Sequence, residues 1–177
     1  KSLLLLSRIE NGQYTEMEDV SVDEILDELL PDLMDIYEHK QVRLIRKREE
    51  QPFIIRCNHS LAQILVSNLV KNSLLHNREG GELQVFTTPA SLVIRNTGDA
   101  PLDGEKLFRR FYHGMDGKKD STGLGLAIAR SIALSSSLKL TYEWQDGMHT
   151  FRLVKVKFTV NCGYSQIFPN SLPLFAV

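Results

Sequence analysis

Two pairs of strand-like segments constrain the fold of this chain most strongly. Residues 82–87 and 92–95 are joined by a short turn, and so are residues 139–144 and 150–160. Apolar runs of this length, bounded by turn residues, predict β-strands, and their close spacing predicts hairpins. Because a helical pattern precedes each pair, the order of elements predicts an α+β domain built in layers.

Capping residues mark where the helices begin. Ser21, with Glu24 three residues later, forms a capping box and predicts a helix with apolar residues at three- and four-residue spacing. Pro31 is predicted to kink or interrupt that helix. Asn58 predicts the start of a long helix that ends near residue 77. Residues 2–10 read as the end of another helix, and a last helix ends near residue 135.

Composition narrows the class of protein. The chain has 177 residues, of which 42% are hydrophobic and 24% charged, and its net charge is −1. We therefore expect one soluble domain with appendages and no nucleic-acid partner, because nucleic-acid binding usually needs a basic surface. No apolar stretch reaches the roughly 18 residues that span a bilayer. The chain begins at Lys1, so we expect a fragment of a longer protein.

The two cysteines, Cys57 and Cys162, have neither a metal-binding spacing nor a disulfide framework. Cys57 ends an apolar run, which predicts a buried reduced thiol. This suits a reducing cytosol.

Two asparagines stand on one face of the central helix. Asn68 and Asn72 are four residues apart, and Leu61 and Leu65 share their face. A buried amide without a partner costs about 1–3 kcal/mol, so the pair needs an explanation. One explanation is bonding to main chain or buried water. The other is a ligand role, because Mg²⁺ accepts amide oxygens together with phosphate oxygens, and Asn72 would be that ligand.

A glycine-containing segment, 121–126 (STGLGL), stands directly before the last helix. Glycine lets a backbone approach a phosphate closely, and a helix N-terminus offers free N–H groups to an anion. The alternative is a tight loop that packs well. The segment is no P-loop, because no Gly-Lys-Ser/Thr follows the glycines.

Two further segments carry polar or aromatic groups that suit a nucleotide. Asn96 and Gly98 end a predicted strand, where an amide oxygen could accept from the amino group of adenine. Residues 107–112 (LFRRFY) combine aromatic side chains with arginines that could contact phosphate. An ordinary turn and plain packing are the respective alternatives.

The order of these segments resembles a known family. Residues 68–72, 95–98, 107–112 and 121–128 resemble the N, G1, F and G2 boxes of the histidine-kinase ATPase domain, within the GHKL superfamily. The resemblance covers about residues 20–158. It implies the Bergerat fold, a two-layer α+β sandwich with a mixed, mainly antiparallel sheet and helices on one face, and a flexible lid over the nucleotide.

The resemblance also implies a domain organisation. Residues 1–19 would be the end of a dimerisation and phosphotransfer helix with its linker, since residues 3–14 resemble that helix. Residues 20–160 would be the ATP-binding catalytic domain, and residues 161–177 a tail of unknown role. The lid would cover about residues 99–122.

Carried over by position, the resemblance implies a set of site residues for ATP and Mg²⁺. Asn68 and Asn72 would serve catalysis, with Asn72 as the metal ligand, and Phe108 and Phe111 would secure the base of the lid. The implied nucleotide-binding residues are Asn68, Asn72, His76, Asn96, Gly98, Arg110, Phe111, Thr122, Gly123, Leu124 and Gly125.

Three positions depart from the family pattern. Asn96 stands where the G1 box usually has Asp, which keeps an acceptor but loses a charge. Ala100 replaces the second G1 glycine, and Leu75 replaces a common Lys or Arg. These departures predict weaker nucleotide affinity.

The implied function is a sensor histidine kinase that transfers the γ-phosphate of ATP to a phosphoacceptor histidine. None of the five histidines has the phosphoacceptor context, so the fragment is expected to bind nucleotide without phosphorylating itself. The implied partners are the dimerisation domain of the same kinase and a response regulator. The parent protein would be a homodimer in the bacterial inner membrane, with this domain in the cytoplasm.

Two other functions stay open. One is a degenerate nucleotide-sensing or partner-binding module, which the three departures motivate. The other is a GHKL ATPase such as gyrase, although those enzymes carry Glu as a base at the position of Asn68, and an amide accepts no proton at neutral pH.

Overall fold

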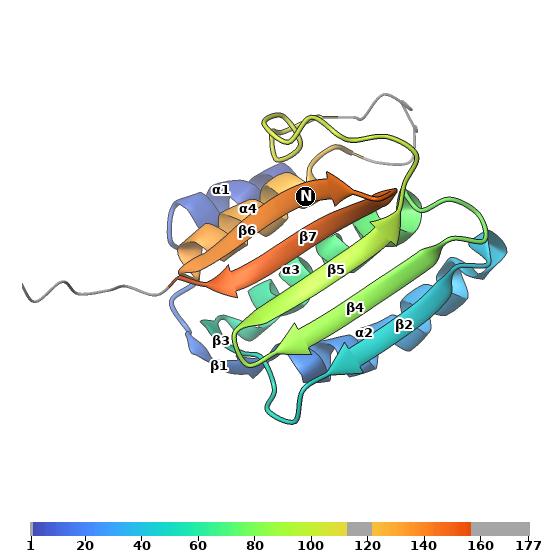
Figure 1. Ribbon diagram of the computed structural model, residues 1–177. Coiled ribbons are helices and arrows are strands. Elements are labelled where there is room, and N and C mark those ends of the chain that lie inside the picture. The colour runs from blue at the N-terminus through green and yellow to red at the C-terminus, as the bar shows by residue number, and fades with distance from the viewer. Residues whose placement is uncertain (1, 113–121, 157–177) are drawn as a thin grey trace, which may run out of the picture.

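The structure is a computed structural model that describes residues 2–112 and 122–156. Helices cover one face of a five-stranded sheet, and the opposite face of the sheet is open (Figure 1). This is the two-layer α+β architecture that the sequence predicts. The helices are α1 (Ser2–Glu10), α2 (Val22–Ile36), the short 3-10 helix η1 (Glu38–Lys40), α3 (His59–Leu75) and α4 (Gly125–Ser135).

The main sheet has the strand order β2-β4-β5-β7-β6. One pairing, β2 with β4, is parallel, and the other three are antiparallel. The sheet is therefore mixed and mainly antiparallel, and both predicted hairpins form. Its strands are β2 (Arg43–Arg48), β4 (Glu82–Thr88), β5 (Ser91–Thr97), β6 (Leu138–Gln145) and β7 (Met148–Lys155).

A second, two-stranded sheet lies outside the main one. Strand β1 (Glu18–Ser21) pairs antiparallel with β3 (Ile54–Cys57). Strand β3 contains the apolar run that ends at Cys57, whereas the sequence assigns the residues up to Asp19 to a linker. Residues 18 and 19 of this segment instead form part of a strand, because they gain backbone partners from a segment more than thirty positions away, with Glu18 opposite Cys57.

The predicted caps begin both long helices. The Ser21 side chain accepts a hydrogen bond from the Glu24 N–H at 3.3 Å, and Asn58 accepts from the Leu61 N–H at 3.3 Å. Pro31 does not interrupt its helix, because α2 runs unbroken to Ile36. Pro31 lies on the exposed side of α2, where water can bond the carbonyl that the missing N–H leaves open.

The core lies between the helices and the sheet. Central residues of α3, among them Leu65, Val66 and Leu69, are buried against it. Helix α1 joins the same core through Leu6 and Ile9 and contacts α4. Cys57 is a buried free thiol, as predicted, and burial raises its pKa. Cys162 lies outside the described residues.

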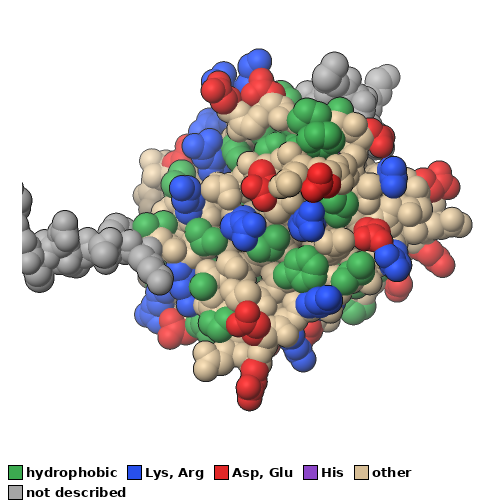
Figure 2. All heavy atoms as spheres, in the orientation of Figure 1, with side chains coloured by type: hydrophobic (Ala, Val, Ile, Leu, Met, Phe, Trp, Pro, Cys, Tyr) green, Lys and Arg blue, Asp and Glu red, His purple; other side chains and the backbone are tan. Residues whose placement is uncertain are grey.

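Neither a membrane-spanning helix nor a uniformly apolar sheet face occurs in the described part of the chain. No helix in residues 2–112 and 122–156 is long and apolar enough to cross a membrane. Figure 2 shows the face of the sheet opposite the helices, where acidic, basic and hydrophobic side chains are interspersed.

Candidate functional site

The α3 asparagines lie where α3 approaches α4. Both Asn68 and Asn72 are half-buried, so they stand at the edge of the apolar stripe rather than inside it. A Cβ added to Gly125, the first residue of α4, would lie 3.5 Å from Oδ1 of Asn68. Among the described residues, no hydrogen bond occupies the side chain of Asn68 or Asn72. Both amides are therefore available to a ligand, and the main-chain alternative does not account for them.

The N-terminus of α4 faces this point without a cap. Its N-cap residue, Leu124, offers no side-chain hydrogen bond. The first bonded amide is that of Ile128, which donates to the Leu124 carbonyl at 2.9 Å. The N–H groups of residues 125–127 have no backbone acceptor in the described part of the chain. Free amides combined with the helix dipole form a site suited to an anion.

Gly123 serves the loop itself. Its φ is +63°, and a Cβ there would lie 2.8 Å from the Phe111 backbone, too close for any other residue. The Phe111 N–H donates to the Gly123 carbonyl at 2.9 Å. The tight-loop alternative thus accounts for Gly123 but not for Gly125, where a Cβ would make only ordinary van der Waals contact with Asn68.

Asn96 is 1% exposed at the end of β5. Its Nδ2 donates to the Thr97 carbonyl at 3.1 Å, which turns Oδ1 inward as an acceptor. Oδ1 is buried and has no hydrogen-bond partner in the described structure. Because an unpaired buried acceptor costs about 1–3 kcal/mol, this oxygen marks a position where a bound donor would be stabilised.

Gly98 follows the same strand. Its N–H donates to the Gly147 carbonyl at 2.9 Å, which ties the end of β5 to the β6–β7 turn. The space beside it is filled, because a methyl group at Gly98 would collide with Nε2 of His149. The missing side chain of Gly98 thus makes room for the imidazole of His149 in β7.

The aromatic segment, residues 107–112, lies in the middle of the loop between β5 and α4. Phe108 packs against the core, and the Arg130 guanidinium lies 5.5 Å from its ring centroid. The Phe111 side chain is 57% exposed, so this residue holds the loop through its backbone. Arg110 forms an ion pair with Glu10 of α1, at 2.6 and 2.8 Å to the two carboxylate oxygens.

The remaining expected residues lie around the same region. His76 is the half-buried C-cap of α3, and Thr122 is exposed beside Gly123. Part of the predicted lid, residues 113–121, lies outside the described residues. Within the described residues, no group of three or more His, Cys, Asp or Glu side chains could hold a metal ion.

His149 is a site residue that the sequence interpretation missed. It lies directly opposite Asn96 across β5 and β7 and is 5% exposed. Burial lowers its pKa, which the nearby Asp99 charge partly counters, so the imidazole is neutral at pH 7. Alternation along 149–153 could have placed His149 on the core face, but its pairing with Asn96 needs the strand register.

Comparison with known proteins shows which family the sequence around this site matches. The sequence profile of the histidine kinase-, DNA gyrase B- and HSP90-like ATPases matches residues 58–160. The sensor histidine kinase RppB of Synechocystis sp. is 31% identical over 99% of this chain, which covers 37% of that protein. TrcS of Mycobacterium tuberculosis, also a sensor histidine kinase, is 27% identical over 85% of this chain and 32% of its own length. The chain thus spans about a third of these relatives.

Solved structures share the fold. The catalytic domain of the histidine kinase ThkA superposes with a TM-score of 0.69 at 18% identity, covering 78% of this chain and 94% of that domain. The histidine kinase AdeS of Acinetobacter baumannii gives a TM-score of 0.70 at 19% identity, over 87% of this chain and 75% of that one.

Proposed function

The chain belongs to the family of histidine kinase-, DNA gyrase B- and HSP90-like ATPases, and from this premise we propose that it supplies the γ-phosphate of Mg·ATP to a phosphoacceptor histidine outside the sequence. The observation that carries the proposal is the meeting of α3 and α4. Asn68, which has no side-chain hydrogen bond among the described residues, stands beside the uncapped N-terminus of α4, and Asn72 lies one turn further along α3. This arrangement combines a neutral oxygen ligand with an anion site.

Each part of the nucleotide has a proposed partner. The N–H groups of residues 125–127 bind phosphate oxygens, and Gly123 keeps the loop in the conformation that exposes them. Asn72 supplies an amide oxygen to Mg²⁺, with Asn68 beside it, and Asn96 accepts from the adenine amino group. Bound Mg²⁺ would neutralise charge on the phosphates during transfer. An amide at position 68 accepts no proton, so we expect little hydrolysis by water.

The surrounding organisation is part of the proposal. Residues 1–19 are the end of a dimerisation and phosphotransfer helix and its linker, and residues 20–160 are the catalytic domain. The parent protein is a membrane-bound homodimer that passes phosphate to a response regulator. The similarity to RppB and TrcS over most of this chain supports this organisation.

Calorimetric titration tests the nucleotide site. The chain is expected to bind ATP and a non-hydrolysable analogue more tightly with Mg²⁺ than with a chelator. In Asn72→Ala the advantage of Mg²⁺ disappears and affinity for Mg·ATP falls about tenfold or more, which corresponds to ~1.4 kcal/mol. Asn11→Ala, which removes an exposed amide after α1, is the matched control and leaves binding unchanged. Absence of binding at millimolar nucleotide would refute the proposal.

A further inference from the structure

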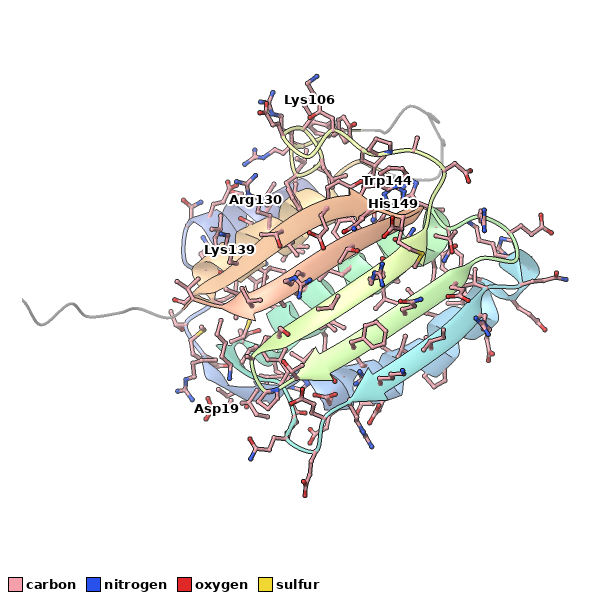
Figure 3. All side chains as sticks on the ribbon, in the orientation of Figure 1. Asp19, Lys106, Arg130, Lys139, Trp144 and His149 are labelled. Carbon is pink, nitrogen blue, oxygen red and sulfur yellow. The ribbon has the colours of Figure 1, made fainter. Side chains whose placement is uncertain are left out.

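Three polar side chains form one row across the end of the sheet. Trp144 of β6 lies opposite His149 of β7, which lies opposite Asn96 of β5. Residues in register on neighbouring strands project from the same face of a sheet. Figure 3 shows Trp144 and His149 together, beside the loop that follows β5.

The row holds hydrogen-bonding atoms that the described structure leaves unused. Oδ1 of Asn96 is a buried acceptor without a partner, and Nε1 of Trp144 is a buried donor without one. His149, between them, uses Nδ1 in its contact with the Tyr142 hydroxyl, and its Nε2 lies against Gly98. Buried polar atoms are nearly always paired in native proteins, so the two unpaired ones on either side of His149 suggest a polar ligand.

The hydrogen bonds of Tyr142 indicate which nitrogen of His149 carries the proton. The Leu102 N–H donates to the Tyr142 hydroxyl at 2.9 Å, and that hydroxyl lies 2.9 Å from Nδ1 of His149. In the described structure Nδ1 is the acceptor that the hydroxyl proton can reach. A proton on Nδ1 would leave the hydroxyl proton without an acceptor. The neutral imidazole therefore presents Nε2–H as a donor toward Gly98.

We propose that His149 reads the adenine base: its Nε2–H donates to N1 of the ring while Oδ1 of Asn96 accepts from the 6-amino group. An acceptor beside a donor matches the donor and acceptor on that edge of adenine. Guanine reverses both, because its O6 would face an acceptor and its N1–H would face a donor. The inference rests on the proposed nucleotide function and assigns the specificity of that site.

The decisive ligand is 1-deaza-ATP, in which a C–H group replaces N1 of the base. Trp144 is the only tryptophan of the chain, so its fluorescence reports binding beside the row. The unchanged protein is expected to bind Mg·ATP about tenfold more tightly than 1-deaza-ATP, the loss of one buried hydrogen bond. It is expected to prefer Mg·ATP over Mg·GTP by at least about tenfold, since two contacts are mismatched.

Two variants link this preference to His149. His149→Phe keeps a ring but removes the donor, so it is expected to bind ATP and 1-deaza-ATP equally. His149→Gln places an amide N–H near the position of Nε2 and is expected to restore part of the difference. Circular dichroism and thermal unfolding check that both variants fold.

The outcomes separate the two proposals. Equal affinity of the unchanged protein for ATP and 1-deaza-ATP overturns the role of His149 while leaving nucleotide binding intact, and this holds even if the variants fail to fold. A tenfold difference that persists in folded His149→Phe also overturns it. Failure to bind any of the three nucleotides instead defeats the proposed function itself.

Discussion

Gly123 and Gly125, on either side of Leu124, have different surroundings. Gly123 has positive φ and contacts the Phe111 backbone, whereas a Cβ at Gly125 would make only ordinary van der Waals contact with Asn68. One glycine is needed for the conformation of the loop, and the other leaves room in front of α4. Substitutions at the two positions should therefore separate folding from binding.

Gly123→Ala is expected to destabilise the fold by about 1–3 kcal/mol, because alanine is strained at positive φ and collides with the loop. Gly125→Ala is expected to keep the melting temperature, since its backbone is helical, but to weaken Mg·ATP binding severalfold by crowding the phosphates. Thermal unfolding and calorimetry of the two variants check this pair. A Gly125→Ala variant that binds normally would remove Gly125 from the site.

Helix α2 contains a proline that lowers the stability of the helix. Pro31 lies inside α2 and cannot donate the N–H that would bond the Asp27 carbonyl. A proline inside a helix costs about 3 kcal/mol, which a stiffer unfolded chain offsets by ~1 kcal/mol. We expect Pro31→Ala to stabilise the domain by about 2 kcal/mol in urea unfolding. A lower midpoint in this variant would show that Pro31 supports the packing of α2.

An ion pair joins helix α1 to the loop between β5 and α4. Arg110, which is expected to contact phosphate, is paired with Glu10 at the end of α1. Both side chains are about half exposed, so the pair itself contributes at most about 1 kcal/mol to stability. The ion pair should instead affect nucleotide affinity, because Glu10 and a phosphate group compete for the guanidinium of Arg110.

Glu10→Gln is therefore expected to raise affinity for Mg·ATP about two- to fivefold while changing stability by less than about 1 kcal/mol. Arg110→Ala should lower affinity and abolish the effect of Glu10→Gln in the double variant. Calorimetry measures all three, with Glu16→Gln, an exposed carboxylate of the linker, as the control. Equal affinities in Glu10→Gln and the unchanged chain would show that Glu10 does not compete for Arg110.

Local signals explain which elements could be predicted. Ser21 and Asn58 cap their helices through contacts three residues away, and the two hairpins close over short turns, so neighbouring residues were sufficient. Strand β1 is short and polar, and it exists only through its pairing with β3. The parallel contact of β2 with β4 likewise joins segments that are remote in sequence.

In the candidate site too, some features follow from neighbouring residues and others from contacts between remote segments. The spacing of Asn68 and Asn72 on one helix, and of Gly123 and Gly125 before another, is visible in sequence. The row that contains His149 combines three strands, so it appears only when their register is known. Likewise, the pairing of Arg110 with Glu10 joins residues one hundred positions apart, and no pattern predicts it.

For the whole molecule, Asp23 connects the two layers. Its carboxylate accepts hydrogen bonds from Arg46 at 2.5 Å, Thr87 at 2.5 Å and the Phe53 N–H at 2.8 Å. It therefore joins α2 to β2, β4 and the segment before β3. Burial alone would raise the pKa of Asp23, but these hydrogen bonds and the Arg46 charge outweigh burial and lower it.

Removal of this carboxylate should destabilise the domain strongly. Asp23→Ala leaves the half-buried Arg46 without its charge partner and the Phe53 N–H and Thr87 hydroxyl without their acceptor, so a loss of about 3 kcal/mol is expected in denaturant unfolding. The matched control is Asp27→Asn, because Asp27 pairs with Arg48 at the exposed surface and should contribute less than about 1 kcal/mol. Similar losses in both variants would contradict the central role of Asp23.

The lowered pKa also predicts a dependence on pH. A carboxyl with a lower pKa in the folded state stabilises the fold above its unfolded-state pKa, and this stabilisation is lost as pH falls through the folded-state pKa. The unchanged chain should thus lose stability from about pH 4 downward more steeply than Asp23→Asn. Melting temperatures between neutral and acidic pH measure the difference, and parallel curves would contradict it.

The path of the chain between β5 and β6 has an evolutionary consequence. After β5 the chain leaves the sheet, runs through a loop and helix α4, and returns to the sheet at β6. Strand β5 itself pairs with β7 (Figure 1). Insertions in this excursion do not shift the register of any strand. Doubling the length of a flexible loop costs only about 0.6 kcal/mol in closure entropy. Descendants of such a chain can thus vary the length of this loop while inheriting the sheet unchanged.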